Sequence, residues 1–532
     1  MNHLNRVQLF YNPPCEPTGY PELSERETRL KILFLAAEAA PFVKVGGLGD
    51  VAGSLPRALL EQSGADIRVA IPFYGEVQRL SLQLQTVARF QIPHAAGAIQ
   101  ATAFAAKFNG IPFYFISGTP IAPEAPIYSP DNLADGRKFT FFSLAALELA
   151  RQLGWQPDIL HANDWHTAPA IYSLFINRLP FFQSTATVLG VHNLPYLGAG
   201  AGPAMAEFGL PAAQNSPLPW WAQDMPLPLG LLSADQIVVA SPTYAREILT
   251  PEFGVGLEDF LASRQERLCG ILNGIDAEAW NPETDAAIPV RYNASNLALR
   301  IENKRSLLNE LGFDPDPEEV LLGVVSRLDA QKGIDLIPGA LQRLAGAPWR
   351  AIFLASGDPA LEQSLRSLQT QFPNRVRAVL RFDAALSRHI YAGADLLLIP
   401  SRYEPCGLTQ MIAMRYGCVP LARATGGLRD TIRDFHAEKD GTGFLFEKPD
   451  ADELAAAIQR ALAVYADRDA WLALQQRGMR EDFSWSRSAR QYLELYQRLI
   501  LQRREKAPAG DLLRSPKQEG VRARQNKNRG SR

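Results

Sequence analysis

The chain has 532 residues, of which 47% are hydrophobic and 21% are charged. This length is several times the roughly 150 residues of an average domain, so one small domain is excluded, and the composition excludes a chain that is disordered throughout. Lys and Arg total 54 against 56 Asp and Glu, which gives a net charge of -2. With so small a net charge, the chain has no overall electrostatic attraction to nucleic acid or to an anionic membrane, and neither is expected as a partner.

The cysteines give no indication of a disulfide framework or a structural zinc site, because they lie far apart and form no CxxC pair. They are Cys15, Cys269, Cys406 and Cys418. The first thirty residues lack the basic start and apolar stretch of a secretory signal, and no run approaches eighteen uninterrupted apolar residues. We therefore expect a soluble, cytoplasmic protein.

Short apolar runs alternate with helical patterns along most of the chain, as in parallel sheets whose strands are connected by helices. The first predicted strands are 31–36, 67–71, 112–116, 159–161, 186–191 and 236–240. After a gap, further strands are predicted at 320–325, 351–354, 376–379, 396–399 and 419–421. Helical spacing is clearest from Leu454 to Tyr465, with Asp450 or Asp452 as the cap. The fold class is therefore α/β, with two doubly wound, Rossmann-like domains in tandem.

The predicted domain organisation has five segments. Residues 1–29 form a flexible extension, 30–255 the first domain, 256–485 the second, 486–502 a terminal helix packed back on the first domain, and 503–532 a disordered tail. The tail carries ten Lys and Arg against three Asp and Glu, so contact with an anionic partner remains an alternative to simple solvation. The segment 200–228, dense in Pro, Ala and Gly, is predicted to be an irregular loop near the cleft between the domains.

A glycine cluster follows the first predicted strand, in the run Lys44-Val45-Gly46-Gly47-Leu48-Gly49-Asp50. Glycines allow close backbone approach, and the start of the next helix would present free N–H groups to a phosphate beside the Lys44 charge. The run is neither GxGxxG nor a Walker loop, so a tight structural turn would explain it equally well.

Polar side chains follow two neighbouring strands of the first half. The run from His161 to His166 includes Asp164, and His192 follows the strand that starts at Ala186. A carboxylate, an indole and imidazoles suit a sugar site, although buried histidines and an Asp that caps the next helix are the alternative. Their position after two neighbouring strands favours a shared site, because ligands bind at the carboxyl ends of such strands.

The second half offers two cations and a carboxylate at strand ends. Arg327 and Lys332 follow the strand that ends at Val325 and have no matching carboxylate pair nearby in the sequence, which suits a diphosphate. Glu404 lies in the run 401–410, which follows a strand and opens a predicted helix, and the run 425–428 repeats the theme of small residues with free amides. The alternatives are that the two cations are ordinary solvated surface charges and that Glu404 is an ordinary acid at the entry of a helix.

Taken together, these motifs mean that the chain from about Leu30 to Leu499 resembles the bacterial glycogen/starch synthases. The matching stretches are KVGGLGDV (44–51), HANDWHT (161–167), VHN (191–193), SPTYAREILTPEFGVGLE (241–258), LNGID (272–276), SRLDAQKG (326–333), SRYEPCGLTQ (401–410), TGGLRDTI (425–432) and DFSW (482–485). The resemblance implies a GT-B glycosyltransferase that moves glucose from ADP-glucose to the non-reducing end of an α-1,4-glucan such as glycogen, with retention of configuration and without a metal or cofactor.

The resemblance also implies roles for individual residues. The residues expected in catalysis are Asp164, His192, Arg327, Lys332 and Glu404. Those expected to bind substrate are Lys44, Gly46, Gly47, Asn273, Phe382, Cys406, Gly407, Leu408, Thr409 and Thr425, with the Phe382 ring against the nucleobase. The chain departs from the family at Asn163, where histidine is usual, at Leu197, where glutamine is usual, and around Pro228, where a lysine is missing.

Three alternative functions stay open at the level of sequence. The donor could be UDP-glucose, the acceptor could be a maltooligosaccharide or a phosphorylated sugar, and a catalytically weak glucan-binding protein is the alternative outside enzymes. The intact cations and carboxylates favour an enzyme, because an inactive protein has no need to keep them together.

Overall fold

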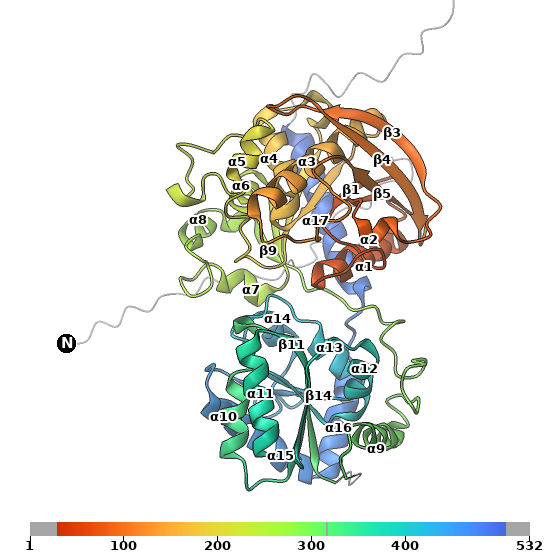
Figure 1. The fold of residues 1–532 in the computed structure, drawn as a ribbon, viewed down its shortest axis with the longest axis vertical. Coiled ribbons are helices and arrows are strands. Elements are labelled where there is room, and N and C mark those ends of the chain that lie inside the picture. Colours follow the sequence, from red (N-terminus) through yellow and green to blue (C-terminus); the bar gives the residue numbers. More distant parts are fainter. Residues whose placement is uncertain (1–28, 315–317, 507–532) are drawn as a thin grey trace, which may run out of the picture.

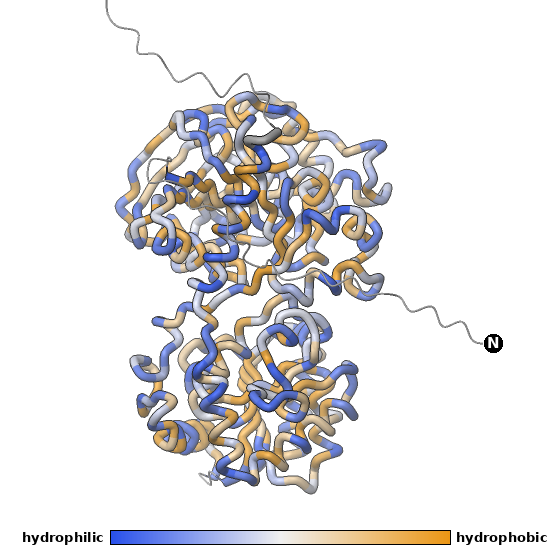
Figure 2. Tube along the Cα trace, turned by 180° about the vertical axis from the view of Figure 1, so that it is seen from behind, coloured by the Kyte–Doolittle hydropathy of each residue, from blue (hydrophilic) through white to orange (hydrophobic). Residues whose placement is uncertain are grey.

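The computed structural model describes residues 29–314 and 318–506, which form two α/β lobes (Figure 1). Most of the predicted extension 1–29 and of the predicted tail 503–532 lies outside the described residues, but the prediction of disorder was wrong for residues 503–506, which belong to the last helix. Figure 2 shows hydrophobic residues concentrated in the interior of both lobes. Each lobe is built around its own sheet, so the expected α/β architecture with two domains is confirmed.

The first sheet has nine strands in the order β3-β4-β5-β2-β1-β6-β7-β8-β9. The strands are β1 (Lys31–Leu35), β2 (Asp66–Pro72), β3 (Gln85–Ile92), β4 (Ile99–Phe108), β5 (Ile111–Ser117), β6 (Ile159–Asn163), β7 (Ala186–Val191), β8 (Gln236–Val239) and β9 (Leu268–Gly270). All pairs are parallel except β3 with β4 and β4 with β5. The six predicted strands are confirmed, whereas β3, β4 and β9 were not predicted.

Helices cover the first sheet and connect its strands. They are α1 (Gly47–Ser63), α2 (Gly75–Gln78), α3 (Asn132–Gln152), α4 (Asp164–Asn177), α5 (Gly202–Glu207), α6 (Pro226–Ser233), α7 (Pro242–Glu247) and α8 (Glu258–Ser263). The expectation of an irregular loop over 200–228 was therefore wrong in part, because α5 and the start of α6 lie within it. Both helices have a proline in their first turn, where proline leaves no helical hydrogen bond unmade.

The second sheet has six parallel strands in the order β12-β11-β10-β13-β14-β15. They are β10 (Val320–Leu328), β11 (Trp349–Gly357), β12 (Val376–Val379), β13 (Leu396–Ile399), β14 (Val419–Arg423) and β15 (Phe444–Phe446). Counted from β10 this is the 3-2-1-4-5-6 order of doubly wound sheets. The five predicted strands are confirmed, and only the three-residue β15 is new.

The helices of the second lobe lie on both faces of its sheet. They are α9 (Arg300–Glu310), α10 (Leu336–Arg343), α11 (Pro359–Gln371), α12 (Ala384–Gly393), α13 (Thr409–Arg415), α14 (Gly426–Thr431), α15 (Ala451–Ala466) and α16 (Arg468–Arg480). Helix α15 is the one with the clearest spacing in the sequence. Its cap is Asp450, whose Oδ1 accepts the backbone N–H of Glu453 at 2.8 Å.

The chain passes between the lobes twice. It leaves the first sheet after β9, which lies beyond residue 255 and still belongs to that sheet. It returns as α17 (Trp485–Lys506), whose buried Trp485, Tyr492 and Leu499 pack in the core of the first lobe. The two crossings meet where Ile275 pairs with Ser484. In Figure 1, α17 is the blue helix inside the upper lobe.

Candidate active site at the carboxyl edges of the two sheets

Asp164 and His192 meet at the carboxyl edge of the first sheet. Strand β6 ends at Asn163, and Asp164 starts α4 with a left-handed φ of 55°, a conformation that Asp tolerates better than most residues. Its Oδ1 accepts the backbone N–H of His192, which follows β7, at 2.7 Å. Burial raises the pKa of Asp164, and His192 and the backbone N–H groups of residues 192 and 193 oppose this rise. The carboxylate thus ties two strand ends together rather than capping α4.

The glycine cluster is held by a carboxylate that was not predicted from the sequence. Glu38 is buried, and its Oε2 accepts the backbone N–H groups of Val45 and Gly46, the latter at 3.0 Å. Its Oε1 accepts the hydroxyl of Tyr128 at 3.0 Å. Val45 and Gly46, which precede α1, therefore do not offer free amides to a ligand, and the expectation of free N–H groups applies only to the start of that helix. The available signal was a lone acid in an apolar run just after the first strand.

The lysine of the same loop stays at the surface. Lys44 is half-exposed, and its Nζ lies 2.7 Å from Oδ1 of Asp50 in the first turn of α1. Gly47 begins that helix, and Gly46 is its N-cap. An exposed ion pair of this kind contributes little to stability, so Lys44 is free to exchange Asp50 for a ligand.

In the second lobe, Lys332 and Glu404 form an ion pair. Lys332 Nζ lies 2.7 Å from Glu404 Oε2, which also accepts the hydroxyl of Ser401 at 2.9 Å. Glu404 is only 7% exposed. Arg327 is 63% exposed at its side chain and lies 3.4 Å from Asp329. The expectation of no carboxylate partner nearby in the sequence was therefore wrong for Arg327, whose partner Asp329 lies in the same run, whereas the partner of Lys332, Glu404, comes from a distant part of the chain.

Three motifs of the second lobe pack at van der Waals distance, and glycine permits this. A Cβ on Gly333, which has a φ of 62°, would lie 2.1 Å from the carbonyl oxygen of Pro400. A Cβ on Gly426 would lie 1.9 Å from the carbonyl oxygen of Glu404. The runs 326–333, 401–410 and 425–428 therefore form one continuous surface after β10, β13 and β14.

The remaining predicted binding residues take different positions. Cys406 and Asn273 are buried beside each other, burial raises the pKa of the Cys406 thiol to about 12, and Asn273 Oδ1 has no hydrogen-bond partner in the described part of the chain. Phe382 is 88% exposed between β12 and α12, so its ring faces are accessible. Three others surround the start of α13, namely Gly407, Leu408 and Thr409.

Hydrogen bonds connect the two carboxyl edges. Thr243, after β8, donates its backbone N–H and its hydroxyl to Asp430 of α14 at 2.7 and 2.6 Å. Asn193 hydrogen-bonds Tyr403, whose pKa burial raises to about 12. Helices α7 and α14 accordingly meet at the junction of the lobes (Figure 1). The residues after both sets of strands therefore face one another.

A third contact across the junction involves Glu247, the last residue of α7. Its Oε1 accepts the Thr425 hydroxyl and the Gly426 N–H, both at 2.9 Å. Burial raises the pKa of this carboxyl. Glu247 lies in the SPTYAREI run that matches the family, but no role was predicted for it from the sequence. The signal was its position after β8, at the same sheet edge as Asp164 and His192.

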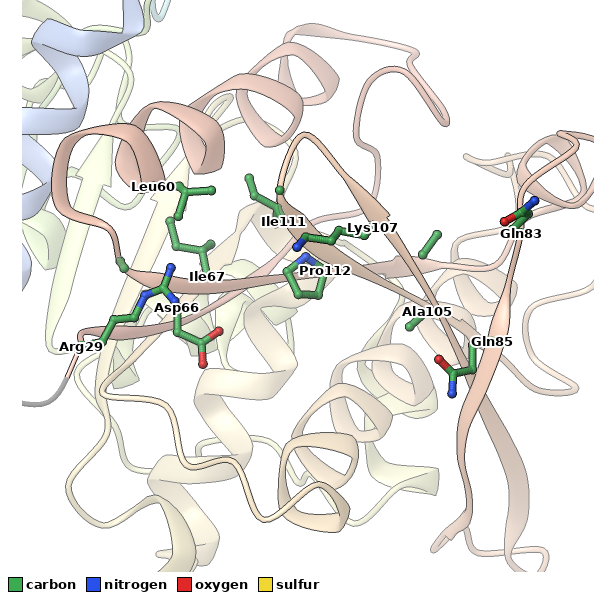
Figure 3. Close-up of a pocket in the computed structure, with 13 residues that line it drawn as sticks. Arg29, Leu60, Asp66, Ile67, Gln83, Gln85, Ala105, Lys107, Ile111 and Pro112 are labelled. Carbon is green, nitrogen blue, oxygen red and sulfur yellow. The ribbon is translucent and has the colours of Figure 1, made fainter.

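A cavity of about 450 Å³ lies elsewhere on the first lobe (Figure 3). Its lining includes Asp66 and Ile111, which begin β2 and β5, and Gln85 at the start of β3. It thus opens at the end of the parallel strands opposite to Asp164 and His192. None of the predicted site residues lines it, so it is not the candidate active site.

Within residues 29–314 and 318–506, no three His, Cys, Asp or Glu side chains gather as metal ligands would. None of the described helices combines the length and the apolar character that crossing a membrane requires.

Comparison with known proteins places this geometry in a family. The family model for the starch synthase catalytic domain matches residues 31–263, and that for glycosyl transferases group 1 matches residues 309–472. The chain is 42% identical to a glycogen synthase of Gloeobacter violaceus and 40% identical to glycogen synthase 2 of Geobacter sulfurreducens, over 88% of this chain and 99% and 98% of those proteins.

Solved structures agree with the sequence relatives. The catalytic domain of starch synthase IV from Arabidopsis thaliana, bound to ADP and acarbose, superposes with a TM-score of 0.82 at 34% identity, covering 89% of this chain and all of that one. A sucrose-phosphate synthase from Thermosynechococcus elongatus, at 19% identity and a TM-score of 0.58, shares the fold. The chain belongs to the glycogen and starch synthase family of glycosyltransferases.

Proposed function

We propose that this protein is a glycogen synthase that transfers glucose from ADP-glucose to the non-reducing 4-hydroxyl of an α-1,4-glucan, with retention of anomeric configuration. The observation that supports this best is the convergence of a Lys332–Glu404 pair and an Asp164–His192 pair on facing carboxyl edges. A cation and a carboxylate on one side, and a carboxylate and an imidazole on the other, suit a sugar diphosphate held between two lobes. The ADP and acarbose in the Arabidopsis relative favour the same pair of ligands.

The departing diphosphate needs positive charge as the glycosidic bond breaks. Lys332 and the exposed Arg327 supply that charge, and Lys44 adds to it from the opposite lobe. Glu404, Asp164 and His192 hold the glucosyl unit, and the exposed Phe382 ring stacks on the base. The other residues proposed at the donor are Gly46, Gly47, Asn273, Cys406, Gly407, Leu408, Thr409 and Thr425.

Retention of configuration requires either a covalent intermediate or attack on the same face as the leaving group. A covalent route needs a free carboxylate nucleophile opposite the phosphate. Asp164 already accepts backbone N–H groups, and Glu404 accepts from Lys332 and Ser401, so both are committed to hydrogen bonds. These contacts favour the same-face route, in which the leaving phosphate accepts the proton of the attacking hydroxyl. Trapping a glycosyl adduct on any Asp or Glu would exclude it.

The experiment measures incorporation of labelled glucose into glycogen and maltooligosaccharides from ADP-glucose and from UDP-glucose. Wild type is compared with Lys332→Ala, Glu404→Ala and a control, Lys439→Ala, at an exposed lysine of the second lobe. We expect transfer from ADP-glucose, a loss of about 10²- to 10³-fold in the two site variants, and no change in the control. Folded protein that binds ADP but elongates neither acceptor would support a binding role. Faster transfer from UDP-glucose than from ADP-glucose would mean that UDP-glucose is the donor.

A further inference from the structure

Three polar side chains crowd around Gly190 behind the carboxyl edge of the first sheet. A Cβ on Gly190 would lie 2.7 Å from Asn163 Oδ1, 3.1 Å from His161 Nε2 and 3.4 Å from His192 Nε2. The missing side chain of β7 thus makes room for these groups. Two of them, Asn163 and His192, share a hydrogen bond of 2.9 Å between Oδ1 and Nε2.

The direction of that hydrogen bond follows from the second contact of Asn163. Its Nδ2 donates to the backbone carbonyl of Leu35 at 2.8 Å. A carbonyl oxygen can only accept, so the amide nitrogen must face Leu35 and Oδ1 must face His192. Because Oδ1 also can only accept, Nε2 of His192 must carry a hydrogen. A neutral His192 therefore has a single tautomer, with its lone pair on Nδ1.

The Nδ1 atom of His192 is buried and has no hydrogen-bond partner among the described residues. A buried acceptor without a donor destabilises a protein unless a ligand supplies one. The neighbouring imidazole does not supply it, because His161 Nδ1 is engaged with the Tyr496 hydroxyl at 2.7 Å and His161 Nε2 has no hydrogen-bond partner among the described residues. Burial, reinforced by His192, lowers the pKa of His161 to about 3, so this ring stays neutral.

We propose that Asn163 is a positioning residue that holds His192 in the Nε2–H tautomer, so that Nδ1 accepts a hydrogen bond from a hydroxyl of the transferred hexose. The hexose part of this inference rests on the proposed function, whereas the tautomer part does not. The histidine that is usual at position 163 in the family could offer His192 either a hydrogen-bond donor or an acceptor. The carboxamide offers only an acceptor, because Leu35 fixes its orientation.

The tautomer is read directly by NMR of protein labelled with ¹⁵N-histidine, whose seven histidines keep the spectrum simple. In wild type we expect a protonated Nε2 and an unprotonated Nδ1 for His192, assigned with His192→Gln. Asn163→Leu keeps the size of the side chain but removes the acceptor, so the single tautomer is lost. Asn163→Asp keeps an oxygen toward His192 and restores it. A protonated Nδ1 in wild type, or an unchanged tautomer in Asn163→Leu, would overturn the proposal.

The hydroxyl is found by kinetics with ADP-glucose and its monodeoxy analogues. In wild type we expect one analogue to lose about tenfold to 100-fold in kcat/KM, because it leaves Nδ1 unpaired. In Asn163→Leu, ADP-glucose drops to the level of that analogue, and Asn163→Asp regains part of the difference. Equal discrimination in wild type and Asn163→Leu would show a merely structural role. If wild type transfers no glucose at all, the proposed function fails while the NMR arm still decides the tautomer.

Asn303 provides the matched control. It is a buried Asn of the second lobe whose side chain also bonds the backbone, accepting from Val290 N at 3.0 Å and donating to Val290 O at 2.8 Å. We expect Asn303→Leu to lower the melting temperature as Asn163→Leu does, without any change in the His192 spectrum or in the discrimination between ADP-glucose and its deoxy analogues.

Discussion

Lys332 and Glu404 neutralise each other at 2.7 Å, so a diphosphate that approaches Lys332 competes with a carboxylate. Removing Glu404 frees the lysine and also removes a group proposed to hold the sugar. We therefore expect Glu404→Ala to bind ADP as tightly as wild type or more tightly, while transfer falls about 10²- to 10³-fold. Calorimetric titration with ADP beside transfer assays checks this. Weaker ADP binding in Glu404→Ala would show that the carboxylate serves the nucleotide rather than the sugar.

His166 makes the fold sensitive to acid. Burial, with Lys138 second, lowers its pKa to about 3, whereas an unfolded histidine has a pKa near 6.5. As the pH falls, His166 therefore takes up a proton more readily in the unfolded state than in the folded state. The stability that the folded protein gains from keeping His166 neutral is fully present above pH 6.5 and is lost as the pH falls toward 3. At pH 5 the loss is about 2 kcal/mol per such histidine.

Denaturant unfolding at pH 7.5 and pH 5 tests the role of His166. We expect His166→Phe to lose less stability between these pH values than wild type, because an aromatic ring there packs beside Tyr128 and Phe139 without titrating. His436→Gln, at an exposed position, is the control. Equal losses in wild type and His166→Phe would refute the assignment.

At the residue scale, the site residues that directly follow apolar strands could be predicted from the sequence. Residues that hold other parts of the site in place could not. Asp164, His192, Lys332 and Glu404 stand directly in motifs after strands, and the structure brings them into two pairs. Glu38 lies after β1 as well, yet an isolated acid carries no pattern. Its contacts with the loop at Val45 and with Tyr128 depend on a fold that joins distant segments.

At the scale of elements, the contact between the turn after β10 and the end of β13 depends on Gly333. Its φ of 62° and the 2.1 Å approach of Pro400 O act together against any side chain. Gly312 has a similar φ of 66° but nothing within 4 Å of an added Cβ. A substitution at Gly312 therefore measures the cost of the left-handed backbone conformation alone, without the clash that a side chain at Gly333 would make.

We expect Gly312→Ala to lose about 1 kcal/mol of unfolding free energy, and Gly333→Ala to lose more than this, about 2–4 kcal/mol. Because Gly333 follows Lys332, the second substitution also displaces the lysine, and transfer activity falls with it. Chemical denaturation and the glucose-transfer assay measure both effects. Equal losses of unfolding free energy in the two variants would mean that the backbone at Pro400 shifts to accommodate the added Cβ at little cost.

The strands that the sequence predicted are those with continuous apolar runs, and the strands that it missed lack them. Strands β3 and β4 lie at the sheet edge with mixed exposure, so their residues alternate and their apolar content is diluted. Strands β9 and β15 have only three residues each, too few to carry a period. Central strands such as β6 and β7 are buried throughout and are predictable for that reason.

At the scale of the molecule, the way in which the lobes are joined could not be predicted from the sequence. The terminal helix was expected on the first lobe, and α17 does lie in its core. The contacts of Thr243 with Asp430 and of Glu247 with Thr425, however, join residues separated by 187 and 178 positions. No local pattern encodes such pairs, because their partners are set by the placement of one sheet against the other.

The Thr243–Asp430 contact should control how the two half-sites come together. Each half-site is complete within its own lobe, so weakening the junction leaves both lobes folded but lets them separate. We expect Thr243→Val combined with Asp430→Ala to raise the KM for ADP-glucose about tenfold to 100-fold, the effect of losing the two hydrogen bonds that Asp430 accepts from Thr243. Small-angle scattering should show a larger radius of gyration. Asp440→Ala removes an exposed acid that pairs with Arg433 inside the second lobe and should change neither quantity. An unchanged KM and radius in the double variant would mean that the other contacts, from Glu247 and Asn193, suffice to hold the edges face to face.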